Sequence, residues 1–258
     1  MDDLSHRPLS FRHQAHAQCV DCSLSPICLP VAIDIEDLHR LDAIIQRSRP
    51  LHRGDHLYRE NNPFEGIYAV RSGALKVYTT TDSGEEQVTG FYLPGEVVGM
   101  DGIHTDTHTS SAVALETTSV CEIPFQQLQD LSHDIPSLQN HFFKLMSKEI
   151  QTNQLLMLLL SKKTAESRIA SLLLSLAERY KRRRLSEYSF RLPMSRSDIG
   201  NYLGLAVETV SRIFTRFQTQ NVLVVEGKEI TVLDKEALCR ISLGGEESVS
   251  GRCRQHGT

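Results

Sequence analysis

The chain has 258 residues, of which 40% are hydrophobic and 23% are charged, the proportions of an ordinary globular protein large enough to bury a core. These values exclude disordered, collagenous and disulfide-scaffold proteins. The longest apolar run, Leu155–Leu160, is too short for a membrane span, and Met1–Gln18 lacks the apolar stretch of a secretory signal. We therefore expect a cytoplasmic protein with no membrane partner. The net charge of −4 by itself argues against nucleic-acid binding.

The first half of the chain changes character twice. Residues 1–30 read as a flexible polar tail followed by a cysteine-rich loop that contains Pro26 and Pro30. Residues 34–48 carry apolar residues at helical spacing behind Asp34, a candidate N-cap. Short strands broken by glycine turns follow, at 66–70, 73–78, 88–93, 111–114 and 120–123. This spacing predicts a small antiparallel sandwich or barrel within residues 31–136.

Residues 137–164 predict one long helix, because no proline or glycine interrupts them. An apolar seam repeats at alternating spacings of four and three, with one asparagine inside it: Met146, Ile150, Asn153, Met157 and Leu160. A single Asn in such a seam fixes register and oligomeric state. A stripe facing the core of a monomer is the alternative. However, Leu145, Leu156 and Leu159 form a second apolar face, which favours a parallel homodimer.

Residues 165–242 predict a second domain, followed by a polar tail over 243–258. Within it, apolar residues of 195–217 are spaced as two packed helices with a tight turn at Gly204. A predicted hairpin at 222–225 and 230–233 follows. This order is typical of a winged helix-turn-helix that binds double-stranded DNA.

Three polar residues of the second helix face away from its apolar side: Glu208, Ser211 and Arg212. Arginine can donate two bonds to guanine, glutamate can accept from cytosine, and serine can serve either. An exposed ion pair between Glu208 and Arg212 is the alternative, because residues four apart are neighbours on a helix. The turn glycine, the apolar core and the predicted wing favour base reading.

The charge of this region differs from that of the whole chain. Between Lys162 and Phe217 there are 12 Lys and Arg against 5 Asp and Glu, a balance of +7, so the rest of the chain carries −11. Phosphate binding is a local requirement, so the overall charge does not oppose it. Our phosphate-contact candidates are Lys162, Lys163, Arg196 and Arg216. The run Arg182–Arg184 is either part of that surface or a solvated patch.

Three of the six cysteines have a Cys-x2-Cys-x5-Cys spacing: Cys19, Cys22 and Cys28. With Cys121 as a fourth thiolate they would satisfy a structural zinc ion or an iron–sulfur cluster. For Cys121 alone, a buried strand cysteine is the alternative. We expect Cys239 and Cys253 not to be ligands, and His13 and His16 are possible replacement ligands.

The order of parts resembles the cyclic-AMP receptor protein/fumarate-nitrate reduction regulator (CRP/FNR) superfamily, most closely its oxygen-sensing FNR-type members. The motifs that carry the resemblance span residues 19–242: the four cysteines, Leu158–Lys163, Asp198–Leu205 and Val207–Arg212. The resemblance implies an α+β fold. Its parts would be an N-terminal β-roll sensor domain of the cyclic-nucleotide-binding type, a long dimerisation helix and a C-terminal winged helix-turn-helix.

The same resemblance implies a function. Cys19, Cys22, Cys28 and Cys121 would hold a [4Fe-4S] cluster that oxygen converts to [2Fe-2S], lowering dimerisation and DNA binding. Glu208, Ser211 and Arg212 match the family's base-reading positions for palindromic TTGAT…ATCAA sites, at which such regulators act as activator or repressor of anaerobic genes. RNA polymerase would contact patches near residues 80–87, Thr117 and Arg183, although each of these patches could be an ordinary surface loop.

The sequence departs from the family pattern at three places. Asn153 stands where well-known members carry an acidic residue in the dimer seam, so we expect a dimer less dependent on its cluster. Ala206 occupies a predicted N-cap that favours Ser or Thr. Nucleotide-binding relatives have an Arg after a Gly-Glu pair, but here Pro94–Glu96 is followed by Thr109–Ala112 without arginine, so cyclic-nucleotide binding is not expected. The sequence contains no nucleophile–base pair, phosphate loop or HExxH motif, so it does not predict an enzyme.

Overall fold

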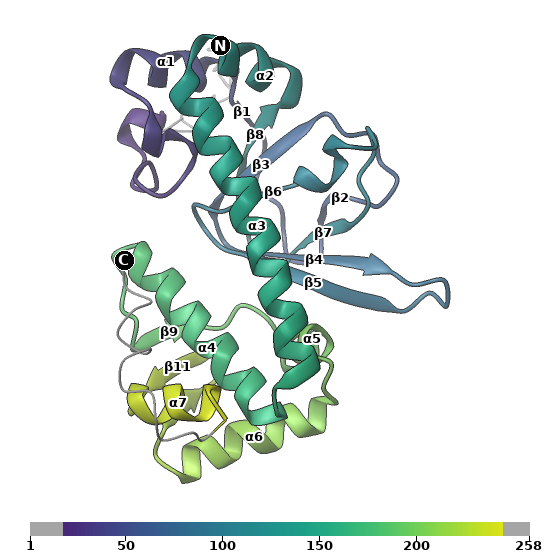
Figure 1. The fold of residues 1–258 in the computed structure, drawn as a ribbon, viewed down its shortest axis with the longest axis vertical. Coiled ribbons are helices and arrows are strands. Elements are labelled where there is room, and N and C mark those ends of the chain that lie inside the picture. Colours follow the sequence, from purple (N-terminus) through teal and green to yellow (C-terminus); the bar gives the residue numbers. More distant parts are fainter. Residues whose placement is uncertain (1–17, 245–258) are drawn as a thin grey trace, which may run out of the picture.

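The computed structural model describes residues 18–244, which form an α+β fold of two domains joined by one long helix (Figure 1). The helices are α1 (Ile35–Ile44), α2 (Phe125–Asp134), α3 (Pro136–Lys162), α4 (Ala165–Arg182), α5 (Arg196–Leu203), α6 (Val207–Thr219) and α7 (Lys235–Ser242), with short 3-10 helices η1 (Cys19–Asp21), η2 (Leu29–Ala32) and η3 (Met100–Ile103). The strands are β1 (Gln46–Arg47), β2 (His56–Tyr58), β3 (Gly66–Ser72), β4 (Leu75–Thr80), β5 (Glu86–Tyr92), β6 (Val97–Val98), β7 (Ser111–Ala114), β8 (Ser119–Pro124), β9 (Ser189–Arg191), β10 (Leu223–Glu226) and β11 (Glu229–Val232). No helix within these residues is long and apolar enough to cross a lipid bilayer.

The N-terminal domain is built from two antiparallel sheets of four strands, in the orders β1-β8-β3-β6 and β2-β7-β4-β5. This confirms the antiparallel sandwich that the glycine-broken strands predict. Gly73 makes the β3–β4 turn at a φ of +80°, and a Cβ there would lie 2.4 Å from the Thr117 carbonyl oxygen, so only glycine fits. The short strands β1, β2 and β6 lacked enough residues to show an alternating pattern in the sequence.

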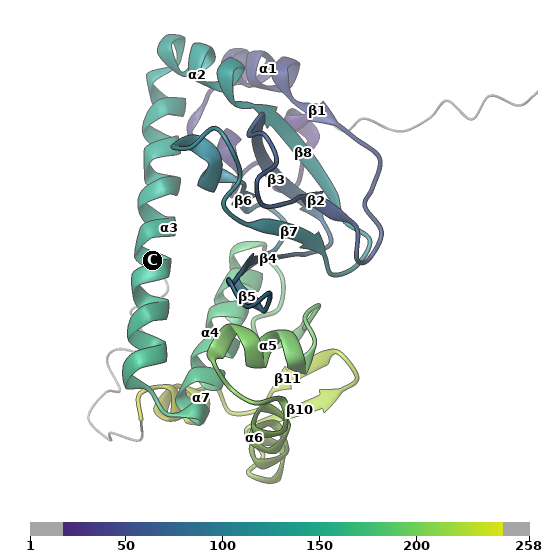
Figure 2. The same cartoon turned by 90° about the vertical axis from the view of Figure 1, so that its right-hand side faces the viewer.

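Helix α3 begins at Pro136, which is well suited to the first turn of a helix. Its N-terminal turns bury Leu138 and Phe142 against the β-roll. From there α3 runs along the molecule to the C-terminal domain (Figure 2). Leu145 and Leu159, on the predicted second face, pack on the cores of the two domains.

The predicted seam of α3 has mixed exposure in the single chain. Ile150 is 60% and Met157 64% exposed, and Asn153 between them is also exposed. Met146 and Leu160 are half-buried. Phe143, which is 55% exposed, continues the same spacing toward the N-terminus and was missed in the sequence. An exposed apolar stripe on a long helix marks an interaction surface.

The C-terminal domain packs α4–α7 against a three-stranded sheet in the order β10-β11-β9. Ser195 and Asp198 form a capping box that starts α5, and Gly204 ends this helix at a φ of +62°. The recognition helix α6 follows directly and buries Val210, Phe214 and neighbouring apolar residues. The predicted winged helix-turn-helix is confirmed. Its sheet also contains β9, which was not predicted because a strand of three residues is too short to show a pattern in the sequence.

The two domains share a core and a buried ionic cluster. Side chains from β4, β5 and α4–α6 belong to one continuous set of buried apolar residues, and α5 lies directly beneath β4 and β5 (Figure 2). The Arg179 guanidinium donates to Glu96 Oε1 at 2.8 Å, and Arg183 donates to the same oxygen at 3.1 Å. Burial alone would raise the pKa of Glu96, but the Arg179 and Arg183 charges lower it overall.

Helix α6 begins at Val207, and its N-cap residue Ala206 provides no side-chain hydrogen bond. Ala206→Thr supplies an oxygen for a free N–H of the first turn and is expected to stabilise the C-terminal domain by about 1 kcal/mol. Ala206→Val has nearly the same shape but no acceptor, so it should give no such gain. Urea unfolding followed by circular dichroism measures both variants, and equal midpoints for Thr and Val would contradict the capping account.

Candidate functional site

The four cysteines predicted as ligands line one cavity on the N-terminal domain. Cys19 lies in η1, Cys22 and Cys28 lie in the loop that follows, and Cys121 lies on β8. All four are free thiols. Apolar side chains complete the wall, including Leu24, Ile45 and Ile123. The fold therefore closes the long sequence gap between Cys28 and Cys121 by laying the N-terminal loop over the sheet.

Backbone hydrogen bonds hold this loop in a series of tight turns. The Cys22 N–H donates to the Cys19 carbonyl at 3.3 Å, and the Cys28 N–H donates to the Leu24 carbonyl at 3.0 Å. The Cys19 N–H donates to Asp42 Oδ1 of α1 at 2.9 Å. These bonds hold the loop around the cavity and tie it to α1.

The buried position of the thiols sets their protonation. Burial, with the Asp42 carboxylate beside it, raises the pKa of Cys19 to about 12. Burial also raises the pKa of Cys28 to about 12 and raises the pKa of Cys121. These thiols hold their protons at neutral pH, so binding a metal group as thiolates must release protons.

Two arginines bring positive charge to the cavity. Arg47 is the cross-strand partner of Cys121, and it pairs with Asp42, with both side chains 14% exposed. Its Nε is buried without a hydrogen-bond partner. Arg71 also lines the cavity, and both guanidinium groups favour the thiolate form of Cys121. An unpaired N–H and two cations beside four thiols suit an anionic metal–thiolate group.

The arrangement of the four thiols bears on the size of that group. Over residues 18–244, no three His, Cys, Asp or Glu side chains are set to hold one metal ion. The four cysteines nevertheless line one and the same cavity, and four thiolates can hold either a zinc ion or an iron–sulfur cluster. His13, His16 and Cys253 lie outside the described residues. Cys239 lies in α7 of the other domain.

The cysteine loop touches α3 as well as the sheet. The 3-10 helix η2, directly after Cys28, packs along α3, and the purple loop lies beside the upper half of that helix in Figure 1. His141 of α3 lies next to the backbone of Cys28, and burial lowers the pKa of His141 overall. A change in the position of the loop would therefore alter its contacts with α3.

The three predicted base-reading residues stand on one exposed side of α6. Glu208, Ser211 and Arg212 are all exposed. Arg212 makes only long contacts within its own helix, such as 3.3 Å to Thr209 Oγ1. Ser211 Oγ donates to the Val207 carbonyl at 3.0 Å. The helix lies at the end of the molecule far from the β-roll (Figure 2), so a duplex could reach these side chains.

The four phosphate-contact candidates differ in how far their side chains are held by contacts within the protein. Lys162 is exposed at the end of α3, and Arg216 forms a surface ion pair with Glu166. Lys163 Nζ donates to the Ser242 carbonyl at 3.1 Å. The Arg196 guanidinium lies 3.2 Å from the centre of the Phe214 ring, and burial lowers its pKa to about 10. Lys163 and Arg196 thus also serve as packing residues within the domain.

The basic run Arg182–Arg184 at the end of α4 does not form one exposed surface. The Arg183 side chain is only 5% exposed, and it donates to the Pro94 carbonyl at 2.6 Å. This placement does not support the expected polymerase contact at Arg183, because the Glu96 carboxylate draws the side chain inward. Thr117 is exposed, as are residues 80–87. Part of the net positive charge counted between Lys162 and Phe217 therefore faces the N-terminal domain, not DNA.

In the part of the β-roll where nucleotide binding is not expected, the polar side chains are bonded to other residues of the protein. Glu96 of the Gly-Glu pair is engaged by α4, as described above. His108 is 2% exposed and stacks on Tyr58 with ring centres 3.7 Å apart. Its Nδ1 lies 3.1 Å from Asp101 Oδ1, and Asp101 also accepts from Ser110 Oγ at 2.7 Å. Glu96 and Asp101 are thus committed to partners within the protein.

Comparison with known proteins supports this domain order. A cyclic nucleotide-binding domain family matches residues 48–134, and a Crp-like helix-turn-helix domain family matches residues 167–241. The transcriptional activator protein Anr of Pseudomonas aeruginosa is 53% identical over 236 residues, covering 92% of this chain and 97% of its own length. The fumarate and nitrate reduction regulatory protein of Escherichia coli is 47% identical over 224 residues, covering 87% and 90%.

A solved structure agrees with the fold. FixK2 from Bradyrhizobium japonicum superposes with a TM-score of 0.70 at 31% identity, covering 77% of this chain and 97% of its own. The similar proteins are transcriptional regulators and not enzymes, as the lack of a catalytic motif predicts. With a β-roll, a long helix and an exposed recognition helix in this order, the chain belongs to the CRP/FNR family of DNA-binding transcriptional regulators, in its FNR-type group.

Proposed function

We propose that this protein is a cytoplasmic, homodimeric regulator that senses oxygen through an iron–sulfur cluster and controls anaerobic gene expression at palindromic TTGAT…ATCAA sites. The observation that carries the proposal is the single cavity that Cys19, Cys22, Cys28 and Cys121 line together, with Arg47 opposite Cys121 on the neighbouring strand. Relatives named for fumarate and nitrate reduction support the anaerobic role.

The four cysteine thiolates would be the cluster ligands. A [4Fe-4S] cluster that oxygen converts to [2Fe-2S] would supply the oxygen-sensitive chemistry. Arg47 would hold Asp42 against the Cys19 backbone and bring positive charge close to Cys121. Because η2 packs on α3, the state of the loop would reach the dimer helix.

The exposed stripe of α3 would meet the same stripe of a second copy. Ile150 and Met157 provide apolar contact on either side of Asn153. An amide at this position removes the repulsion that two facing carboxylates would produce. Two recognition helices in such a dimer would read half-sites about one helical turn apart.

A contact with RNA polymerase is part of the proposal. It would use the exposed Thr117 and the tip of the β4–β5 hairpin. A zinc-stabilised DNA-binding regulator without oxygen sensing is the second candidate, because four thiolates also satisfy zinc. The relatives named for fumarate and nitrate reduction favour the cluster.

The first prediction concerns the metal group. Anaerobically purified protein is expected to be brown, to contain iron and acid-labile sulfide, and to bleach in air. Cys22→Ser should lose this colour, because one of four ligands is missing. Ser25→Ala changes the same loop and the same cavity wall but removes no thiol, so it should keep the colour. A colourless wild-type protein that contains zinc would support the second candidate, and a brown Cys22→Ser protein would overturn the ligand assignment.

The second prediction concerns pH. The thiols of Cys19, Cys28 and Cys121 have raised pKa values and are protonated at neutral pH in the metal-free protein. Binding as thiolates releases these protons, so affinity for a thiol-seeking probe ion such as Co(II) should rise steeply from pH 6 to 8. Titration at several pH values, followed by the thiolate–cobalt absorption, measures this rise. A pH-independent affinity would show that the thiols are already ionised.

The third prediction separates base contacts from phosphate contacts. Arg212→Ala should cost about 1–3 kcal/mol at one base position and relax the preference there. Arg216→Ala should weaken binding to all sequences equally and lower the salt slope by about 1. Fluorescence anisotropy with single-base variants of the site, at several salt concentrations, compares the two. A uniform loss for Arg212→Ala would make it a phosphate contact.

A further inference from the structure

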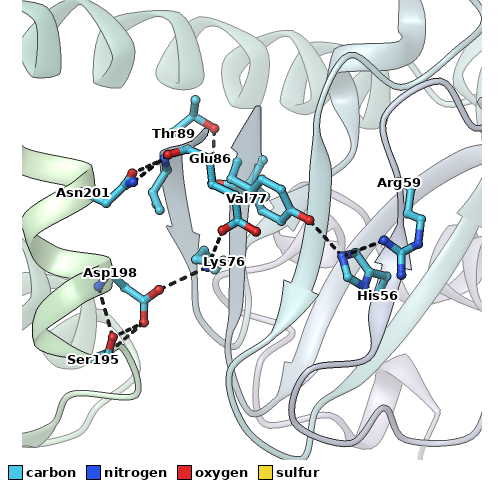
Figure 3. Close-up of polar contacts among 11 residues, drawn as sticks. His56, Arg59, Lys76, Val77, Glu86, Thr89, Ser195, Asp198 and Asn201 are labelled. Carbon is cyan, nitrogen blue, oxygen red and sulfur yellow. Dashed lines mark hydrogen bonds and ion pairs between the residues drawn. The ribbon is translucent and has the colours of Figure 1, made fainter. Parts of the chain in front are cut away.

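Helix α5 is joined to the sensor domain by polar contacts with the β4–β5 hairpin (Figure 3). We infer that Asp198 and Asn201 are docking residues that hold the helix-turn-helix against the sensor domain and thereby position the recognition helix α6. Together with Lys76, Glu86 and Val88 they form what we call the docking seam. This inference goes beyond the proposed function, because the seam contains no cysteine and does not depend on a cluster.

The Asn201 side chain replaces a missing neighbour strand at the edge of β5. Its Oδ1 accepts from the Val88 N–H at 2.5 Å, and its Nδ2 donates to the Glu86 carbonyl at 2.6 Å. The Gln87 amide donates back to the Asn201 carbonyl at 3.0 Å. β5 is the last strand in its sheet, so its outer backbone groups need partners. A side-chain amide is suited to this task because it both donates and accepts.

The second contact of the seam is an ion pair. Lys76 Nζ of β4 lies 3.1 Å from Asp198 Oδ1 and 3.2 Å from Glu86 Oε2. The Lys76 side chain is 14% and the Asp198 side chain 18% exposed, so water screens this pair less than a surface pair. The other oxygen of Asp198 accepts from the Ser195 N–H at 2.9 Å in the capping box. One carboxylate therefore both starts α5 and ties its first turn to the hairpin.

Further contacts fix the angle of docking. The Phe91 ring of β5 lies 5.2 Å from the Tyr202 ring of α5, measured between centres. Arg179 of α4 also donates to the Phe91 carbonyl of β5 at 2.6 Å and to Glu96. Because ring packing and ionic contacts lie on different helices of one domain, they restrict rotation as well as separation.

The docking of α5 is transmitted to α6 by close packing. A Cβ on Gly200 would lie 2.6 Å from the carbonyl oxygen of Leu205, in the turn before α6, and 3.5 Å from Val210 Cγ2 of α6, so the absence of a side chain at Gly200 lets the turn and α6 approach α5 closely. Ile199 and Leu203 of α5 are fully buried beside Val210 of α6. The base-reading residues Glu208 and Arg212 are exposed, and α6 lies beyond α5 as seen from the hairpin (Figure 2). The docked arrangement leaves the DNA-reading side open, so it is the arrangement that binds DNA.

The first test disrupts the docking seam by a substitution on its DNA-binding-domain side, at Asn201 of α5. In full-length protein, Asn201→Ala should raise hydrogen exchange in two separate segments, α5 and β5. It should also weaken binding to specific and random DNA by the same factor, about tenfold for the loss of two hydrogen bonds. Gln129→Ala removes an exposed helix amide of α2 and should change neither quantity. Metal-free protein should show the same exchange pattern, so failure here is separable from failure of the cluster proposal.

A second variant approaches the seam from the sensor side. Lys76→Met keeps the length of the side chain and leaves every residue of the helix-turn-helix unchanged. It should raise exchange in α5, across the domain boundary, and lower DNA affinity in the same sequence-independent way. Exchange that rises only in the domain carrying each substitution, or DNA affinity equal to that of the wild type, would overturn the inference.

Discussion

One continuous helix has to satisfy three environments along its length, and the rest of the molecule is arranged around that constraint. Helix α3 has 27 residues, a length of about 40 Å. Leu138 and Phe142 are buried in the β-roll at one end, and Leu159 packs on the shared core near the other. Ile150 and Met157 between them remain exposed. A helix with both ends anchored and exposed apolar residues in its middle can connect the β-roll, the second copy proposed above and the helix-turn-helix without a separate linker.

The two domains are also joined by charges that are expensive to bury. Glu96, Arg179 and Arg183 are all largely shielded from water, and removing one partner would leave an uncompensated charge. Together with the docking seam, this cluster specifies one relative orientation where apolar contact alone would permit several. The basic residues that suggested a DNA surface in the sequence are in part the means of holding the domains together.

Much of the fold could be predicted from periodicity, and the exceptions have physical reasons. The strands from Gly66 to Tyr92, the long helix and the helix-turn-helix carry patterns over enough residues to be read. Strands of two or three residues carry none, and α2 was missed although Leu128 and Leu131 bury one of its faces. Spacing and family resemblance indicated the cysteine set. No local pattern could show that Arg47 lies opposite Cys121, or that Asn201 binds β5, because both contacts join segments far apart in the chain.

In the proposed dimer the exposed stripe of α3 pairs with a second copy, and Asn153 lessens the need for a cluster. Sedimentation velocity over a range of concentrations, on iron-loaded protein under nitrogen and on metal-free protein, measures whether the chain pairs in both states. Ile150→Glu places a charge in the stripe and serves as the monomeric control. Dimers are expected in both preparations of the wild-type chain. A metal-free protein that sediments purely as a monomer, like Ile150→Glu, would show that pairing still requires the cluster.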